Sequence, residues 1–157
     1  MIQDSGERRQ FETGAVRDIQ EGKGRCDLLP LKVIGIILDD RILTAIGHFM
    51  TTGDMGIIAD VIVAFGTKRW DSFETALLEV AVHYEEGAKK YKERNWEEGI
   101  DCHSYVDSAV RHYIKYLRGD DDEPHDRAFL WNLLGLLWTL DNKPELNDLP
   151  FNKEKIV

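Results

Sequence analysis

The sequence predicts an all-α protein, a compact helical bundle with a loop-rich N-terminal arm. From residue 31 onward, apolar residues recur at three- and four-residue spacing, the periodicity of amphipathic helices. Capping residues, glycines and prolines divide this pattern into helix-length segments. The first 30 residues lack such periodicity. We therefore expect one domain over 1–157, with an arm at 1–30, a helical core at 31–140 and a tail at 141–157.

Composition limits the classes of function. Hydrophobic residues make up 43% and charged residues 31% of the chain, a balance typical of soluble globular proteins. The net charge of −9 argues against a nucleic-acid binder, which needs a basic face. An acidic protein can still bind a polyanionic small molecule if metal ions bridge the two. The polar N-terminus and the short apolar stretch at 129–140 indicate neither a secretory signal nor a membrane span, so we expect a soluble, cytoplasmic protein.

The arm has four glycines and weak hydrophobicity, so it is predicted as a loop with at most a short helical turn. Four apolar residues are available to anchor it on a core: Phe11, Ile19, Leu28 and Leu29. A helix is expected over 31–50, and a turn with Asp54 as N-cap follows it. Residues 55–70 are predicted as a second helix, although their β-branched residues leave a strand open.

The second half of the chain carries stronger helix signals. Capping residues begin an amphipathic helix over 71–91, and a loop follows. A further helix over 102–118 stops at Gly119. After an acidic turn, the last long helix is apolar nearly all round, so it should lie at the centre of the core. The residues beyond 140 are predicted as an extended tail.

The helix over 71–91 carries a polar stripe. Glu79, His83 and Glu86 are four and three residues apart, which places them within about 60° of one another around the axis. Two carboxylates and an imidazole on one face suit a hard divalent cation. The plainer interpretation is a solvated helix surface, where acids are common.

The next helix places His103, Asp107 and Arg111 on one continuous face, with His112 beside it. Asp107 could complete a carboxylate cluster with the preceding helix. Arg111 could equally neutralise Asp107 as a simple intrahelical pair, and the sequence leaves both interpretations open.

The acidic turn before the last helix contains an ExxD pair, Glu123 and Asp126. Such turns are usually solvated helix starts that the helix dipole favours. His125 and Asn132 are seven residues apart and share a face. Asn132 stands in an apolar helix, and a buried Asn must find hydrogen bonds, either within the fold or with a ligand.

Candidate phosphate-binding residues lie in two segments. Lys89 and Lys90, with Lys92 and Arg94, follow the acidic stripe. The arm contributes others: Arg17, Lys23 and Arg25. Glycines beside them would let the backbone approach a ligand, but GKGR lacks the spacing of a P-loop. Asn95 and Trp96 could hydrogen-bond to and stack on a base, although a loop Trp more often packs on the core.

Several blocks together resemble a known family: RQFETGAVRDIQEGKGRCDLLP, EVAVHYEEGAKKYKERNWEEGI and YVDSAVRHYIKYLRGDDDEPHDRAFLWNLLGLLW. Their order resembles that of phage and bacterial dATP/dGTP diphosphohydrolases, which look related to MazG-like all-α nucleoside triphosphate pyrophosphohydrolases. The resemblance covers residue 9 to about residue 138. It implies hydrolysis of a deoxynucleoside triphosphate to the monophosphate and pyrophosphate.

The resemblance also implies a metal site, because MazG-like enzymes hold Mg²⁺ or Mn²⁺ with EExxE and ExxD patterns on successive helices. The literal pattern is absent here, since Glu79 and Glu86 are seven residues apart and Asp107 stands where a glutamate is expected. The resemblance therefore implies the role of magnesium (or manganese) ligand for acidic residues of this chain. The candidates are Glu79, Glu86, Asp107, Glu123 and Asp126.

Roles for the other residues follow from the same scheme. The general base would be a carboxylate, Glu79 or Asp107, or else His112. Cationic groups would neutralise the phosphates: Arg17, Lys23, Arg25, Lys89, Lys90 and Arg111. Asn95, Trp96 and Asn132 would face the nucleoside or metal-bound water, and the arm would act as a lid. MazG-like folds often place the site between subunits, so we expect a homo-oligomer, with apolar residues of the segment 57–65 exposed to permit it.

Two other functions stay open at this point. His112 and the His125-Asp126 dipeptide are compatible with an HD-type phosphohydrolase that releases triphosphate, although its further histidine would have to be His48 or His103. The acidic surface and the missing EExxE motif are compatible with a non-catalytic helical protein that docks on a host factor.

Overall fold

The computed structural model describes residues 5–152, and within them the chain forms a short hairpin followed by six α-helices. The hairpin pairs β1 (Arg8–Gln10) with β2 (Val16–Asp18) in antiparallel register, so that Arg9 lies opposite Arg17. The helices are α1 (Leu31–Leu38), α2 (Arg41–Thr52), α3 (Met55–Trp70), α4 (Phe73–Lys90), α5 (Cys102–Arg118) and α6 (His125–Asn142). Three short 3₁₀ turns complete the fold: Cys26–Leu28, Asn95–Glu98 and Pro144–Leu146. The predicted all-α class is confirmed.

Polar side chains fix where several helices begin. The carboxylate of Asp40 accepts from the backbone N–H of Leu43, and that of Asp54 accepts from Gly56. The Ser72 hydroxyl accepts from Thr75 in the same way at the start of α4. These caps satisfy donors that a helix start leaves unpaired. At the C-terminal end of α5, Gly119 adopts a φ of 86°, a left-handed conformation that glycine tolerates best.

The helix predicted over 31–50 is two helices. Asp39 ends α1 in the left-handed conformation, with a φ of 51°, and Asp40 caps α2 at once. Both halves have helical periodicity, so the apolar pattern alone did not reveal the break.

Residues 55–70 form a helix, and the strand alternative is wrong. The β-branched residues Ile58, Val61 and Ile62 are buried in the core, where packing overrides strand propensity. Phe65 is buried with them. The expectation of exposed apolar residues on 57–65 holds only in part, because these four are buried while Ala59, Val63 and Ala64 are exposed.

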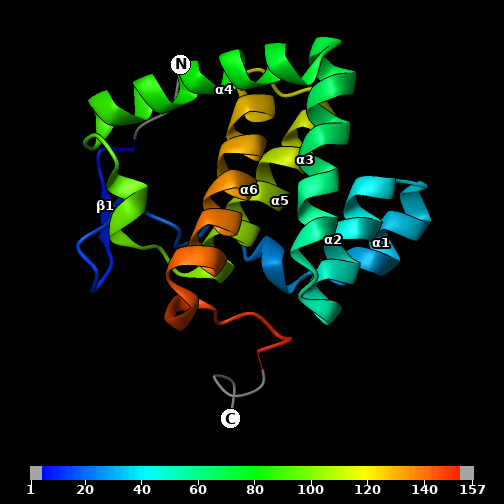
Figure 1. Cartoon of the computed structure of the whole chain (residues 1–157), viewed down its shortest axis with the longest axis horizontal. Coiled ribbons are helices and arrows are strands. Elements are labelled where there is room, and N and C mark those ends of the chain that lie inside the picture. The colour runs from blue at the N-terminus through cyan, green and yellow to red at the C-terminus, as the bar shows by residue number, and fades with distance from the viewer. Residues whose placement is uncertain (1–4, 153–157) are drawn as a thin grey trace.

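The core lies where α5 and α6 pack against each other at the centre of the molecule (Figure 1). Phe129, Leu130, Leu133 and Leu136 of α6 are at most 1% exposed, which confirms the predicted central position of this helix. Helix α4 crosses above α6, and its C-terminal end extends towards the hairpin at the left of the view (Figure 1). The hairpin, the end of α4 and the α5–α6 pair all contribute side chains to one cavity.

The arm and the tail are more ordered than the sequence predicts. Phe11 and Ala15 of the arm are buried, whereas Leu28 is 70% exposed and does not anchor it. In the tail, Leu149 is buried and the ring of Phe151 packs edge-on against Phe49 at 5.4 Å between centroids. Residues 153–157 of the predicted tail lie outside the described part of the chain. No helix in the described part is long and apolar enough to cross a membrane.

Candidate active site

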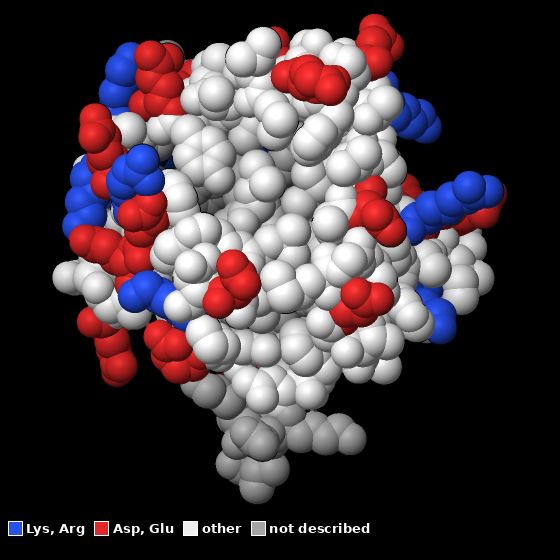
Figure 2. Space-filling view, viewed as in Figure 1, with Lys and Arg blue, Asp and Glu red and all other residues white. Residues whose placement is uncertain are grey.

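A cavity of about 670 Å³ opens between the hairpin, the C-terminal half of α4, the 3₁₀ turn Asn95–Glu98 and the facing surfaces of α5 and α6. This volume lies in the range of small-molecule sites. Eight Lys and Arg residues line the cavity against six Asp and Glu, in a chain whose net charge is −9. Figure 2 shows charges of both signs gathered over the hairpin side of the molecule, while the middle of this face carries few. The cavity is thus locally basic.

Arg17 of β2 enters this cavity between two aromatic rings. Its guanidinium carbon lies 5.6 Å from the centroid of Tyr105 and 5.5 Å from that of Trp131. Nη2 donates to Asn132 Oδ1 at 3.0 Å and to Ser108 Oγ at 3.2 Å. Nη1 is buried and has no hydrogen-bond partner. Burial lowers the pKa of Arg17, yet a guanidinium stays protonated at neutral pH.

No carboxylate among residues 5–152 pairs with Arg17. Asn132, which the sequence left between a structural and a ligand role, uses its amide N–H on the Ala128 carbonyl at 2.8 Å. Its oxygen is thereby turned towards Arg17. The two predicted residues, 115 positions apart, form one unit in which Asn132 orients the cation.

Asp107 and Arg111 form the intrahelical pair that the sequence left as one of two alternatives. Arg111 Nη2 lies 2.6 Å and 2.7 Å from the two carboxylate oxygens of Asp107. The backbone N–H of Cys26 donates to Asp107 Oδ1 at 2.6 Å, and Arg111 donates to the Gly24 carbonyl at 2.6 Å. Both side chains line the cavity. They also fasten the arm to α5.

Asn95 fastens the hairpin from the other side. Its Oδ1 accepts from the Val16 N–H at 2.9 Å, and its Nδ2 donates to the Val16 carbonyl at 2.8 Å. Its neighbour Trp96 packs edge-on against Tyr84 and Trp138, with ring centroids 6.0 Å and 5.2 Å away. Trp96 is half-buried and lines the cavity, so it is both a packing residue and part of the wall.

The five carboxylates expected to hold magnesium do not converge. Glu79 pairs with Arg127, and Asp126 pairs with Arg69 at 2.9 Å. Both acids line a second, acidic cavity of about 520 Å³ rather than the large one. Asp107 is occupied by Arg111, Glu123 borders both cavities, and Glu86 lines neither. These residues do not fit a single Mg²⁺ ion.

The predicted cations also separate. Lys23 and Lys90 line the large cavity, and Lys23 Nζ lies 3.6 Å from Asp18. Arg25 instead pairs with Asp27 at 2.7 Å, and neither Arg25 nor Lys89 lines the cavity.

His83 of the predicted polar stripe is buried, whereas Glu79 and Glu86 are half-buried beside it. It lies on the buried side of α4 with Ala76 and Val80. The i, i+4, i+7 spacing of these three residues is the sequence signal that predicts this burial. Burial lowers the pKa of His83 to about 4, so the ring is neutral, and its Nδ1 has no hydrogen-bond partner.

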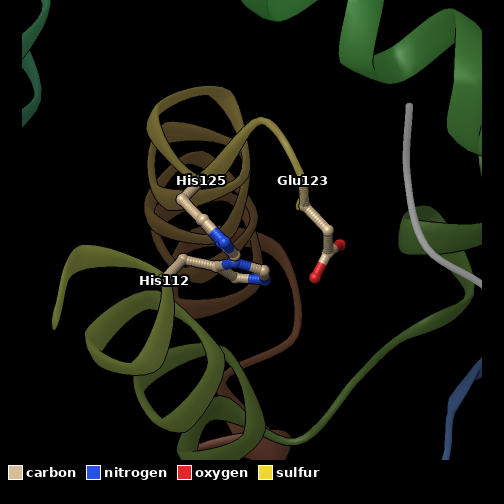
Figure 3. Close-up of side chains that lie close together, drawn as sticks. All are labelled: His112, Glu123 and His125. Atoms are coloured by element: carbon tan, nitrogen blue, oxygen red, sulfur yellow. The ribbon is translucent and has the colours of Figure 1, made fainter. Parts of the chain in front are cut away.

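The structure brings together two histidines that the sequence did not pair. His112 Nδ1 of α5 and His125 Nδ1 of α6 are 2.9 Å apart, and His125 Nε2 lies 2.7 Å from Asp122 Oδ1. The carboxylate of Glu123 points towards the same space (Figure 3). Burial and the neighbouring His125 hold the pKa of His112 well below its usual range. His112, Asp122 and Glu123 all line the large cavity.

Comparison with known proteins gives one match. A family model described as dATP/dGTP diphosphohydrolase, N-terminal, matches residues 65–149, which is more than half of the chain. The matched segment contains α4, α5 and α6 and therefore most of the cavity wall, but not the hairpin. Searches of curated proteins and of solved structures found no match.

Proposed function

This chain belongs to the dATP/dGTP diphosphohydrolase N-terminal family, and on that premise we propose that it hydrolyses dATP or dGTP to the monophosphate and pyrophosphate. The observation that carries the proposal is the buried guanidinium of Arg17, which faces a basic cavity without a carboxylate partner in the described chain. Burying an unpaired charge is costly, so a bound anion would offset that cost. A triphosphate supplies such an anion.

The cavity is divided in a way that suits a nucleotide. Its cationic side includes Arg17, Lys23 and Lys90, which we assign to the phosphates. Its aromatic wall includes Tyr84, Trp96 and other rings, and we assign the base to this wall. Aromatic faces bind bases by stacking, at about 1–3 kcal/mol per base. Asn95 acts indirectly, because both ends of its amide already hold Val16.

In the proposed reaction, the oxygen of a water molecule bonds to the α-phosphorus while the bond from that phosphorus to the α–β bridging oxygen breaks. Pyrophosphate leaves with the bonding electrons, and a general base takes the proton of the water. In the metal-free enzyme we assign the base to His112, whose ring is neutral and lies on the cavity wall. A metal ion bound to this imidazole would take over its role, because it would lower the pKa of a bound water molecule. Mg²⁺ or Mn²⁺ is proposed to arrive with the triphosphate and to neutralise its charge.

The test is a panel of deoxynucleoside triphosphates with Mg²⁺ and Mn²⁺, with products separated by chromatography. Wild type should release pyrophosphate and the monophosphate from dATP or dGTP. Arg17→Gln removes the unpaired cation and should lower kcat/KM at least about 100-fold, since charged hydrogen bonds contribute about 1.5–3 kcal/mol and the buried site adds to this. Arg41→Gln, an exposed arginine that lines neither cavity, is the matched control. Equal turnover by Arg17→Gln and wild type would refute the assignment.

A second candidate is the HD-type enzyme that releases inorganic triphosphate, and the contact between His112 and His125 favours it. Against it, Asp126 of the His-Asp dipeptide is held by Arg69 and lines the other cavity. The same chromatogram separates the two, because the HD-type reaction yields deoxynucleoside and triphosphate. Nucleotide-dependent stabilisation without any product would instead indicate a binding protein.

We also propose that the chain self-associates through α1. Val33, Ile36 and Ile37 of this helix are 54%, 66% and 74% exposed, an apolar surface of the kind that interfaces cover. Ile37→Asp should lower the mass measured by light scattering if wild type is an oligomer. A monomeric wild type would exclude the interface. Because dNTP pools are cytoplasmic, we place the reaction in the cytoplasm, of the host if the protein is phage-encoded.

A further inference from the structure

We propose that His112, Glu123 and His125 form a binding site for a first-row transition-metal ion, such as Fe²⁺, Co²⁺ or Zn²⁺, at the edge of the large cavity. Asp122 would orient His125 from outside the coordination sphere. The part this ion plays in hydrolysis rests on the proposed function. Binding of the ion itself does not, since it needs no nucleotide.

The geometry of the three side chains supports a shared ion. One ligand atom from each residue lies within 4.8 Å of the others. Figure 3 shows the two rings side by side and the Glu123 carboxylate directed at the space beside them. The two Nδ1 atoms are 2.9 Å apart. Two nitrogens that bind one metal at right angles, each at about 2.1 Å, are about 3.0 Å apart, so the observed pair already has this spacing.

The contact between His125 and Asp122 has the form of an outer-shell interaction. Asp122 Oδ1 lies 2.7 Å from His125 Nε2 and can accept its proton. This bond places the proton of His125 on Nε2 and leaves the Nδ1 lone pair directed at His112. Metal-binding histidines commonly donate their second N–H to a carboxylate in this way, which fixes the tautomer and the ring orientation.

The ligand types select the class of ion. Mg²⁺ prefers oxygen ligands and retains its water, whereas imidazole nitrogen suits the later divalent ions of the first row. The cluster offers two nitrogens and one carboxylate, which differs from the all-carboxylate set predicted from the sequence. Three protein ligands leave coordination positions for water or substrate, as in catalytic metal sites.

The position of the cluster connects it to the cavity. His125 is 2% exposed and lines the second cavity, His112 lines the large one, and Glu123 borders both. An ion held between them would therefore face the space assigned to the phosphates. The simpler explanation of the short contact is an N–H···N hydrogen bond between the rings, and metal binding distinguishes the two.

The experiment is a Co²⁺ titration of metal-free full-length protein, followed by visible absorption and equilibrium dialysis without nucleotide. Wild type should bind one ion per chain at this site, with d–d bands that change with nitrogen coordination. His112→Gln and Glu123→Gln should each weaken binding at least tenfold while helical circular dichroism is retained. His48→Gln, an exposed histidine of α2, should bind as wild type does. Excess Mg²⁺ should leave the bands in place.

A second group, Asp101, His103 and Asp148, provides a check on specificity. Absence of Co²⁺ binding, or binding that His103→Gln removes and His112→Gln does not, would overturn the proposal. A bound ion at His112 without turnover of any nucleotide would refute the proposed function and leave the metal site intact. Turnover by a protein that binds no transition ion would refute the metal site and leave the proposed function intact.

Discussion

At the scale of single residues, burial changes what a charged group does. Arg17 keeps its charge in the interior because Asn132 and Ser108 orient it and two aromatic rings flank it. His83, also on the cavity wall, loses its charge because burial penalises the imidazolium more than the nearby Glu86 carboxylate stabilises it. One residue is therefore available to an anion and the other is not.

The pKa of His83 predicts a pH-dependent stability. Its pKa falls from 6.5 to about 4 in the folded protein, so between these values the unfolded chain binds the proton and the folded chain does not. The free energy of unfolding should thus fall as pH drops from about 7 to about 4, by at most about 3 kcal/mol from this group. Above about pH 7 the ring is neutral in both states and contributes nothing to the slope.

Urea denaturation at pH 7.5 and pH 5 measures this effect. His83→Phe keeps a ring beside Trp131 and should show a smaller loss of stability than wild type over this interval. A residual slope is expected, because the pKa of His112 is lowered as well. His48→Gln changes an exposed ring and should behave as wild type. An unchanged slope in His83→Phe would show that His83 titrates as it does in the unfolded chain.

At the scale of elements, the hairpin is held by contacts from distant parts of the chain. Asn95 clamps Val16 across 79 positions, and Asp107 accepts from Cys26 across 81. Neither strand is longer than three residues, so no alternating pattern marks them in the sequence. This is why helices were predicted well by periodicity while the arm was predicted as loop.

Removing the clamp should loosen the hairpin. Asn95→Ala leaves the N–H and carbonyl of Val16 without these partners, at a cost of about 1–3 kcal/mol. Because Val16 adjoins Arg17, we expect the KM for the nucleotide to rise at least tenfold. Hydrogen exchange of the hairpin amides should quicken in parallel. Asn142→Ala, which removes a bond from an exposed Asn to its own helix, is the control and should change neither quantity.

The difference between contacts within one helix and contacts between distant segments also explains how much of the site the sequence predicted. The spacing within one helix identified Asp107 and Arg111 as an alternative pair, and the resemblance identified the family that the match confirms. The ligand set depends on which helix ends meet in space, and local spacing carries no such information. Glu79 and Asp126 consequently face the second cavity, Asp107 faces the large one, and Glu123 borders both.

At the scale of the whole molecule, an acidic chain concentrates cations in one cavity. The net charge of −9 repels anions from most of the surface, while eight Lys and Arg line the cavity. The interior charge of Arg17 is screened little by salt, and the exposed lysines are screened more. Polyphosphate should therefore bind at this cavity and depend on Arg17.

Inorganic tripolyphosphate tests this without a base or turnover. A ligand that binds only the folded state raises its stability, by about 2.7 kcal/mol at 100 times its Kd. For a chain of this size that corresponds to a rise of about 5–10 °C in the melting temperature. Wild type and Arg41→Gln should show the rise. Arg17→Gln should show little of it relative to its own ligand-free melting temperature, which corrects for any change in intrinsic stability. Equal shifts in all three proteins would place the anion elsewhere and remove the buried guanidinium from the phosphate site.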